Sequence, residues 1–115
     1  MKQIGQIALA QFPSTDLETA KLRPVLLLRE SSTRHNDWLV CMVSSRLHQQ
    51  EEGIDERLMD DDPDFAASGL KIASVIRLSR LAVLEGRILV GAIGALPDKR
   101  LRTLKQRLAD WIIHS

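Results

Sequence analysis

The sequence predicts a mainly β fold, in which a small twisted antiparallel sheet or barrel is followed by one C-terminal amphipathic helix. Two observations lead to this prediction. Short apolar runs separated by turn-forming residues recur as far as residue 96, and the last segment changes to a helical period. The composition, 44% hydrophobic and 27% charged residues, is typical of a globular protein. We expect one domain over residues 1–115.

The first part of the chain alternates between predicted strands and turns. Residues 13–22 are expected to form a loop, because proline, serine, threonine and aspartate at its start favour turns. Glycines in the last strand mark bends. The expected strands are residues 4–12 (IGQIALAQF), 23–30 (RPVLLLRE), 38–45 (WLVCMVSS), 71–78 (KIASVIRL) and 87–96 (RILVGAIGAL).

The segment 97–114 is the predicted helix. Its apolar residues recur every three to four positions, and we expect this stripe, Trp111 included, to pack on the sheet. Pro97 suits the first turn. The opposite face is basic, and we expect it to be solvated unless it contacts nucleic acid. The apolar stripe consists of Leu101, Leu104, Leu108, Trp111 and Ile112, and the basic face of Lys99, Arg100, Arg102, Lys105 and Arg107.

Charge is distributed unevenly along the sequence. The net charge is +1, but residues 51–64 hold eight carboxylates and one arginine, so the rest of the chain carries 15 basic and 7 acidic residues, or +8. We expect residues 51–64 to be a long solvated loop, with at most a short strand near Ile54. A body this basic permits binding of a polyanion without requiring it.

Several classes of chemistry are missing from the sequence. The histidines are scattered and no metal-binding or phosphate-cradling motif occurs, so we expect neither a metal nor a cofactor. The single cysteine, Cys41, lies in the run WLVCMV and is interpreted as a core thiol in a reducing cytoplasm. No apolar stretch approaches the roughly 18 residues that cross a bilayer, and the N-terminus lacks signal-peptide features. We therefore expect a cytoplasmic protein that does not associate with a membrane.

What remains is a set of polar residues in or at the ends of the predicted strands. Arg23 begins one strand, Ser44 and Ser45 end the next, and Ser74 and Arg77 lie in a third. Two arginines and a hydroxyl that converge would suit a phosphodiester, because arginine stays charged and offers a fork of donors to phosphate oxygens. The structural alternative is that the arginines pair with carboxylates at the rim and the serines close turns.

Five segments, in order, resemble the PemK/MazF family of toxin–antitoxin ribonucleases. The third strand ends V-S-S, where the family has a site threonine or serine. The segments are G-Q-I-A-L-A-Q-F-P (5–13), T-D-L followed by Lys21 and R-P-V-L-L-L (15–28), V-S-S (43–45), G-L-K-I-A-S-V-I-R-L-S-R-L (69–81), and G-A-I-G-A-L (91–96) before a helix.

The resemblance implies a Src-homology-3-like barrel, usually a homodimer, that cleaves single-stranded RNA without a metal and is inhibited by a cognate antitoxin. The 2′-hydroxyl attacks the phosphate and leaves a cyclic phosphate and a 5′-hydroxyl. Arg23 matches the arginine assigned to proton transfer and phosphate stabilisation, and Ser44 the hydroxyl that binds the phosphate. Arg77 matches a basic position near the site. The loop 13–22, with Thr15, Asp16 and Lys21, matches the loop that covers RNA.

Departures from the family pattern leave the general base unassigned. Ser74 stands where several members have a carboxylate, and Val75 where many have glutamine. Asp16 or His48 are the alternatives for the base, and each also has an ordinary structural interpretation. Two other functions therefore stay open. One is a non-enzymatic toxin like CcdB, which poisons DNA gyrase through its C-terminal helix, and the other is a barrel that binds RNA or a partner without cutting.

Overall fold

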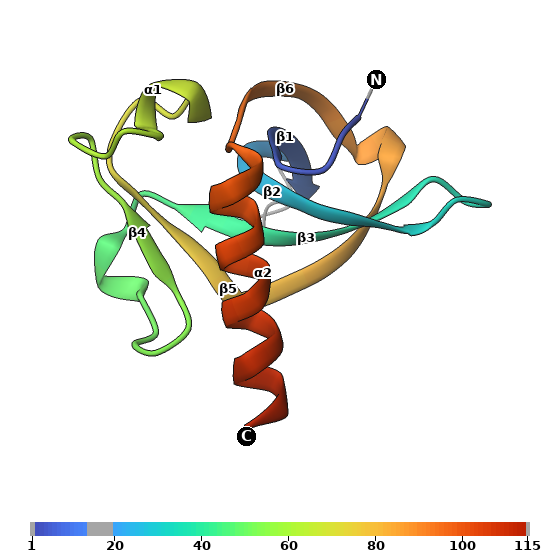
Figure 1. The fold of residues 1–115 in the computed structure, drawn as a ribbon. Coiled ribbons are helices and arrows are strands. Elements are labelled where there is room, and N and C mark those ends of the chain that lie inside the picture. Colours follow the sequence, from blue (N-terminus) through green and yellow to red (C-terminus); the bar gives the residue numbers. More distant parts are fainter. Residues whose placement is uncertain (1, 14–19, 115) are drawn as a thin grey trace.

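A curled antiparallel sheet, open at both edges, forms the body of the protein (Figure 1). The structure is a computed structural model that describes residues 2–13 and 20–114. In this part of the chain the strand order is β4-β5-β3-β2-β1-β6. The strands are β1 (Gln6–Pro13), β2 (Ala20–Ser32), β3 (Asp37–Ser44), β4 (Glu56–Leu58), β5 (Ser74–Glu85) and β6 (Leu89–Ala95). The helices are α1 (Phe65–Ser68) and α2 (Asp98–Ile113), with 3₁₀ turns η1 (Leu47–Gln49) and η2 (Gly86–Ile88). The predicted fold class is confirmed.

Several strands extend further than the sequence indicated. The expected loop 13–22 is shorter, because the β1–β2 ladder continues as far as the pair Pro13↔Ala20. Strand β5 runs on to Glu85, since it pairs along the whole of β3, ending at Asp37↔Glu85. Pairing with a neighbouring strand gives hydrogen-bond partners to backbone N–H and C=O groups, which in a loop would bind water instead. Residues 14–19, which include Thr15 and Asp16, lie outside the described residues.

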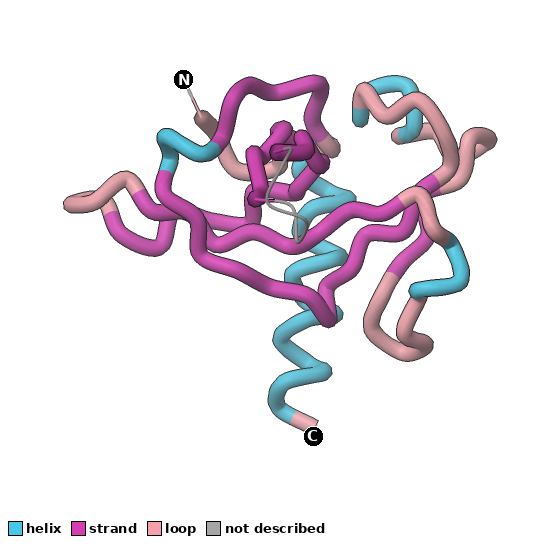
Figure 2. Tube along the Cα trace, turned by 180° about the vertical axis from the view of Figure 1, so that it is seen from behind, coloured by secondary structure: helices cyan, strands magenta, loops and turns pink. Residues whose placement is uncertain are grey.

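Helix α2 packs across one face of the sheet (Figures 1 and 2). A second cluster of buried apolar side chains, which includes Val25, Leu27 and Val40, belongs to the opposite face, because these residues alternate along their strands with those that face α2. Leu101, Leu104 and Leu108 are buried against the sheet, as the helical period predicts. The prediction that Trp111 and Ile112 join this core is wrong, because 45% of Trp111 and 56% of Ile112 are exposed. In Figure 1 the C-terminal turns of α2 extend past the strands, so no sheet lies beneath them.

The acidic segment 51–64 is not the solvated loop that its composition suggests. Ile54 and Leu58 are fully buried, and β4 pairs with β5 through Glu56↔Ile76. This pairing carries the carboxylates of the segment to helix α2. There they surround Arg100, and the expectation that the whole basic face of α2 is solvated is therefore wrong at this residue. The contacts of Arg100 are Nε to Glu56 Oε2 (2.9 Å), Nη1 to Asp62 Oδ2 (3.0 Å) and Nη1 to Asp64 Oδ2 (3.0 Å).

Cys41 belongs to the core, as predicted. Its side chain is buried between the sheet and α2, and burial, with a smaller effect from Asp55, raises the pKa of the thiol to about 12. A thiol of such a pKa stays protonated at neutral pH and is a poor nucleophile. Within the described ranges, no helix combines the length and the apolar character needed to cross a membrane.

Candidate functional site

Strands β2, β3 and β5 bring Arg23, Ser44 and Arg77 to one cleft of about 460 Å³. Arg23 lies near the start of β2, Ser44 ends β3, and Arg77 pairs with Met42 of β3. The antiparallel ladder is what joins these positions, which are far apart in the sequence. The other lining residues are Pro24, Met42, Val43, Gln49, Arg80, Leu81 and Ala82. Among the residues that the structure describes, no carboxylate or histidine lines this cleft.

A bulge in β5 adds a third arginine. The register passes from Cys41↔Leu81 directly to Met42↔Arg77, so residues 78–80 of β5 have no partner on β3. The bulge lets Arg77 and Arg80 line the same cleft, although strand alternation would place residues three apart on opposite faces. Sequence reasoning missed Arg80 for this reason. The only signal was the repeated arginine in R-L-S-R, which a strand period does not bring together.

Arg77 is held from behind by Asp55, which sequence analysis also missed. The Nε of Arg77 donates to Asp55 Oδ2 at 3.3 Å, and the exposed fractions of the two side chains are 18% and 0%. Asp55 accepts further hydrogen bonds from the N–H groups of Glu51 (2.9 Å) and Ser79 (2.9 Å), and from the Ser79 hydroxyl (3.0 Å). Burial opposes ionisation, but these donors together hold the pKa of the Asp55 carboxyl below its usual range.

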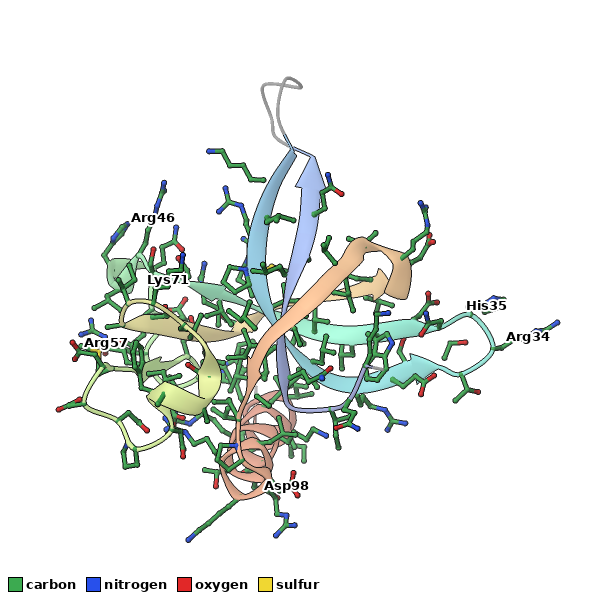
Figure 3. All side chains as sticks on the ribbon, turned by 90° about the horizontal axis from the view of Figure 1, so that it is seen from above. Arg34, His35, Arg46, Arg57, Lys71 and Asp98 are labelled. Carbon is green, nitrogen blue, oxygen red and sulfur yellow. The ribbon has the colours of Figure 1, made fainter. Side chains whose placement is uncertain are left out.

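A second hollow of about 570 Å³ adjoins the cleft and shares Arg23, Pro24, Val43 and Ser44 with it. Basic residues on its wall are Lys21, Arg46 and Lys71. Figure 3 shows the last two on the same side of the molecule, away from Arg34 and His35 at the tip of the β2–β3 hairpin. Apolar side chains, among them Leu22, Ile72 and Ile93, complete the wall. Basic and apolar side chains thus both line the two adjoining hollows.

The predicted hydroxyl residues differ in their surroundings. Ser44 Oγ accepts a hydrogen bond from the N–H of Arg46 at 3.1 Å, which leaves its own proton available to an acceptor in the cleft. Ser45 is exposed and lines the second hollow. Ser74 also borders that hollow, but it is only 3% exposed and its hydroxyl donates to Ile72 O at 2.9 Å. The geometry of Ser74 is therefore that of a turn-closing serine.

Of the two alternatives for a general base, only His48 lies among the described residues, and it does not line the cleft. His48 lies on η1, is exposed, and borders neither hollow. Asp16, with Thr15, falls outside the described residues. Across residues 2–13 and 20–114, no three histidine, cysteine or acidic side chains gather as metal ligands would. The arrangement that the structure does provide, arginines and a hydroxyl around an open cleft, is suited to a phosphate anion.

Comparisons with known proteins agree with this fold. A family model described as PemK-like, MazF-like toxin of type II toxin–antitoxin system matches residues 3–112. The solved structure of the Mycobacterium tuberculosis toxin MazF-mt6 superposes with a TM-score of 0.66 and 23% identity, over 91% of this chain and 93% of that one. An endoribonuclease in complex with its cognate antitoxin, from Mycobacterial species, gives a TM-score of 0.67 and 13% identity, over 96% and 93% of the two chains. At these identities the structural likeness concerns the fold. No match was found among curated proteins.

Proposed function

The chain belongs to the family of PemK-like, MazF-like toxins of type II toxin–antitoxin systems, and on this premise we propose that it is an endoribonuclease that cuts single-stranded RNA without a metal and so inhibits growth. Toxins of this family are endoribonucleases. The observation that supports the proposal most is the cleft, where Arg23, Arg77 and Arg80 lie with the Ser44 hydroxyl and where no carboxylate of the described part of the chain lines the wall. A site of this charge attracts the phosphodiester of RNA.

In the proposed reaction the 2′-hydroxyl attacks the adjacent phosphorus, and the bond from phosphorus to the 5′-oxygen breaks. The products are a 2′,3′-cyclic phosphate and a 5′-hydroxyl. Charge grows on the non-bridging oxygens in the transition state, and the guanidinium groups of Arg23 and Arg77 stabilise it. The Ser44 hydroxyl, which accepts from the N–H of Arg46, donates its proton to one of these oxygens.

The 2′-hydroxyl must also lose a proton and the 5′-oxygen must gain one. Arg23 is the residue to which the family pattern assigns proton transfer. Among residues 2–13 and 20–114, neither a carboxylate nor a histidine lines the cleft. Asp16 and His48 are kept as the sequence-based alternatives for the acceptor. Variants at these two positions decide between them.

We extend the proposal to partners and location. A cognate antitoxin is expected to bind and inhibit the toxin in the cytoplasm, as the family and the antitoxin complex of the mycobacterial endoribonuclease suggest. A homodimer is also proposed, and apolar side chains on β5 and β6 support it. Leu81, Val83 and Val90 are 40%, 58% and 60% exposed.

The test uses purified protein, freed of antitoxin, with single-stranded RNA in EDTA. Cyclic phosphate ends are expected, and Arg23→Ala is expected to lower the cleavage rate on the order of 10³-fold, because a charge-stabilising donor is lost. Arg29→Ala is the matched control, since Arg29 is an exposed arginine of the same strand and lines neither hollow. Cleavage that persists in Arg23→Ala contradicts the mechanism.

The gyrase-poisoning alternative has one observation in its favour. Trp111, Ile112 and Ile113 are 45%, 56% and 72% exposed at the end of α2, where a partner protein can reach them. Inhibition of purified gyrase without any RNA cleavage, abolished by Trp111→Ser, would replace the ribonuclease proposal. Binding of RNA without cleavage or gyrase inhibition would favour the silent barrel.

A further inference from the structure

We propose that Asp55 is a positioning residue of the RNA-cleaving site, which fixes the orientation of the Arg77 guanidinium at the cleft. This inference rests on the proposed function for its catalytic consequence, but the geometry it describes belongs to the protein itself. Asp55 comes from the segment before β4, whereas Arg77 is in β5, so the contact joins two parts of the chain 22 residues apart.

The two oxygens of the Asp55 carboxylate accept hydrogen bonds from different donors. Oδ1 accepts from the N–H of Ser79, a residue of the bulge, and Oδ2 accepts from the Ser79 hydroxyl, the Glu51 N–H and the Arg77 Nε. One buried group therefore holds both the bulge and the arginine beside it. Because the bulge is what brings Arg77 and Arg80 to the same cleft, Asp55 supports the arrangement of both arginines.

The contact to Nε has a specific consequence for Arg77. A guanidinium group is planar, so fixing Nε against a buried carboxylate leaves the terminal nitrogens as the part available to a ligand. Arg77 lines the cleft, while Asp55 borders neither hollow. The carboxylate thus sits behind the arginine and orients it toward the cleft without occupying it.

The surroundings of Asp55 do not fit a general base. Its side chain is fully buried, and four hydrogen bonds engage its two oxygens. A base must be within hydrogen-bond reach of the proton it removes, directly or through one water. The donors around Asp55 also lower its pKa, which weakens it as a base. The role that remains is to position Arg77.

The experiment compares Asp55→Asn with Ser79→Ala in the full chain. In Asp55→Asn the side chain keeps its shape, but an amide N–H₂ replaces one of the accepting oxygens, so kcat is expected to fall on the order of 100-fold with KM nearly unchanged. Ser79→Ala removes a hydrogen bond to the same oxygen as Arg77 but leaves Arg77 paired, and it is expected to keep kcat. Because Asp55→Asn acts mainly through Arg77, it is expected to slow the Arg77→Ala protein by much less than it slows the wild type. A folded Asp55→Asn protein with wild-type kcat, or losses that multiply in the double variant, would overturn the proposal.

A second measurement does not depend on activity. The Nε–H group of Arg77, assigned in ¹⁵N NMR spectra by its absence in Arg77→Lys, is expected to exchange slowly with water in the wild type and in Ser79→Ala, and rapidly in Asp55→Asn. If Asp55→Asn does not fold, the wild type still decides, because exchange at Arg77 as fast as at the exposed Arg34 of the β2–β3 turn refutes the contact. A wild type that leaves RNA uncut while Arg77 Nε–H is protected refutes the proposed function and retains the positioning geometry.

Discussion

Two groups of arginines, one on helix α2 and one in the cleft, differ in the charges around them. Arg100 of α2 contacts Glu56, Asp62 and Asp64, all at 3.0 Å or less. In the cleft, Arg23, Arg77 and Arg80 share a wall on which no described carboxylate lies, and Asp55, which pairs with Arg77, lies behind it. Both groups rest on the same sheet, and both receive acidic residues from the segment 51–64.

The comparison shows that the carboxylates of the acidic segment 51–64 have different effects on the two groups of arginines. Its carboxylates offset charge on the helix and secure the packing of β4, while the cleft arginines keep their donors for an external anion. Positive charge that is not offset within the fold raises repulsion in the free protein and attracts a polyanion. The net charge of +1 conceals this division, because it sums a neutralised region and a basic one.

Arg100→Ala is expected to have the largest effect on stability. The change leaves the half-buried Asp62 and Asp64 without their cation and Glu56 with only a longer contact to Arg107, so the free energy of unfolding should fall by about 2 to 3 kcal/mol in urea titrations. Arg107→Ala is the control on the same helix. Its contact to Glu56 is longer, at 3.5 Å, and its side chain is 42% exposed, so a loss within about 0.5 kcal/mol is expected. Equal losses in the two variants would contradict the distinction between the two sites.

Arg80→Ala is expected to act on RNA binding instead of stability. Loss of one charge-assisted contact should weaken binding of a non-cleavable deoxy oligonucleotide about 10-fold. The slope of log affinity against log salt should flatten by about 0.7. Arg87→Ala removes another exposed arginine, which pairs with Glu85 outside the cleft, and fluorescence anisotropy should detect little change. A weaker affinity in both variants would mean that overall charge, and not the cleft, determines binding.

The smallest expected effect is on the decline of stability at acid pH. The N–H of Asp64 and the guanidinium of Arg100 hold the pKa of Asp62 below its usual range. A carboxyl whose pKa is lower in the folded than in the unfolded protein adds stability above the unfolded pKa of about 3.9, and this stability is lost as pH falls through the folded pKa. Urea titrations from neutral pH down to acid should therefore show a shallower decline for Asp62→Asn than for the wild type. Parallel curves would contradict the assignment.

The strands and the helix were accessible from the sequence because their periods are local. Alternation identified residues 4–12, and the three-to-four spacing identified Leu101, Leu104 and Leu108, which are buried as predicted. The same spacing misplaced Trp111, because a helical period marks a stripe but does not show where the sheet beneath it ends. The arginines and the serine at positions 23, 44 and 77 were found by residue type and motif order, and the ladder then brought them to one cleft.

The sequence by itself determined the mainly β class, the terminal helix, the core thiol and three residues of the candidate site, because each depends on local period, residue chemistry or motif order. Only the tertiary structure decided the roles of Asp55, Arg80 and Arg100. Asp55 and Arg100 act through contacts across 22 and more residues, and Arg80 reaches the cleft through a bulge. A buried aspartate and a solvated one are the same letter in the sequence. The packing of β4, β5 and α2 decides which aspartate is buried and positions another residue, and which one stays exposed to solvent.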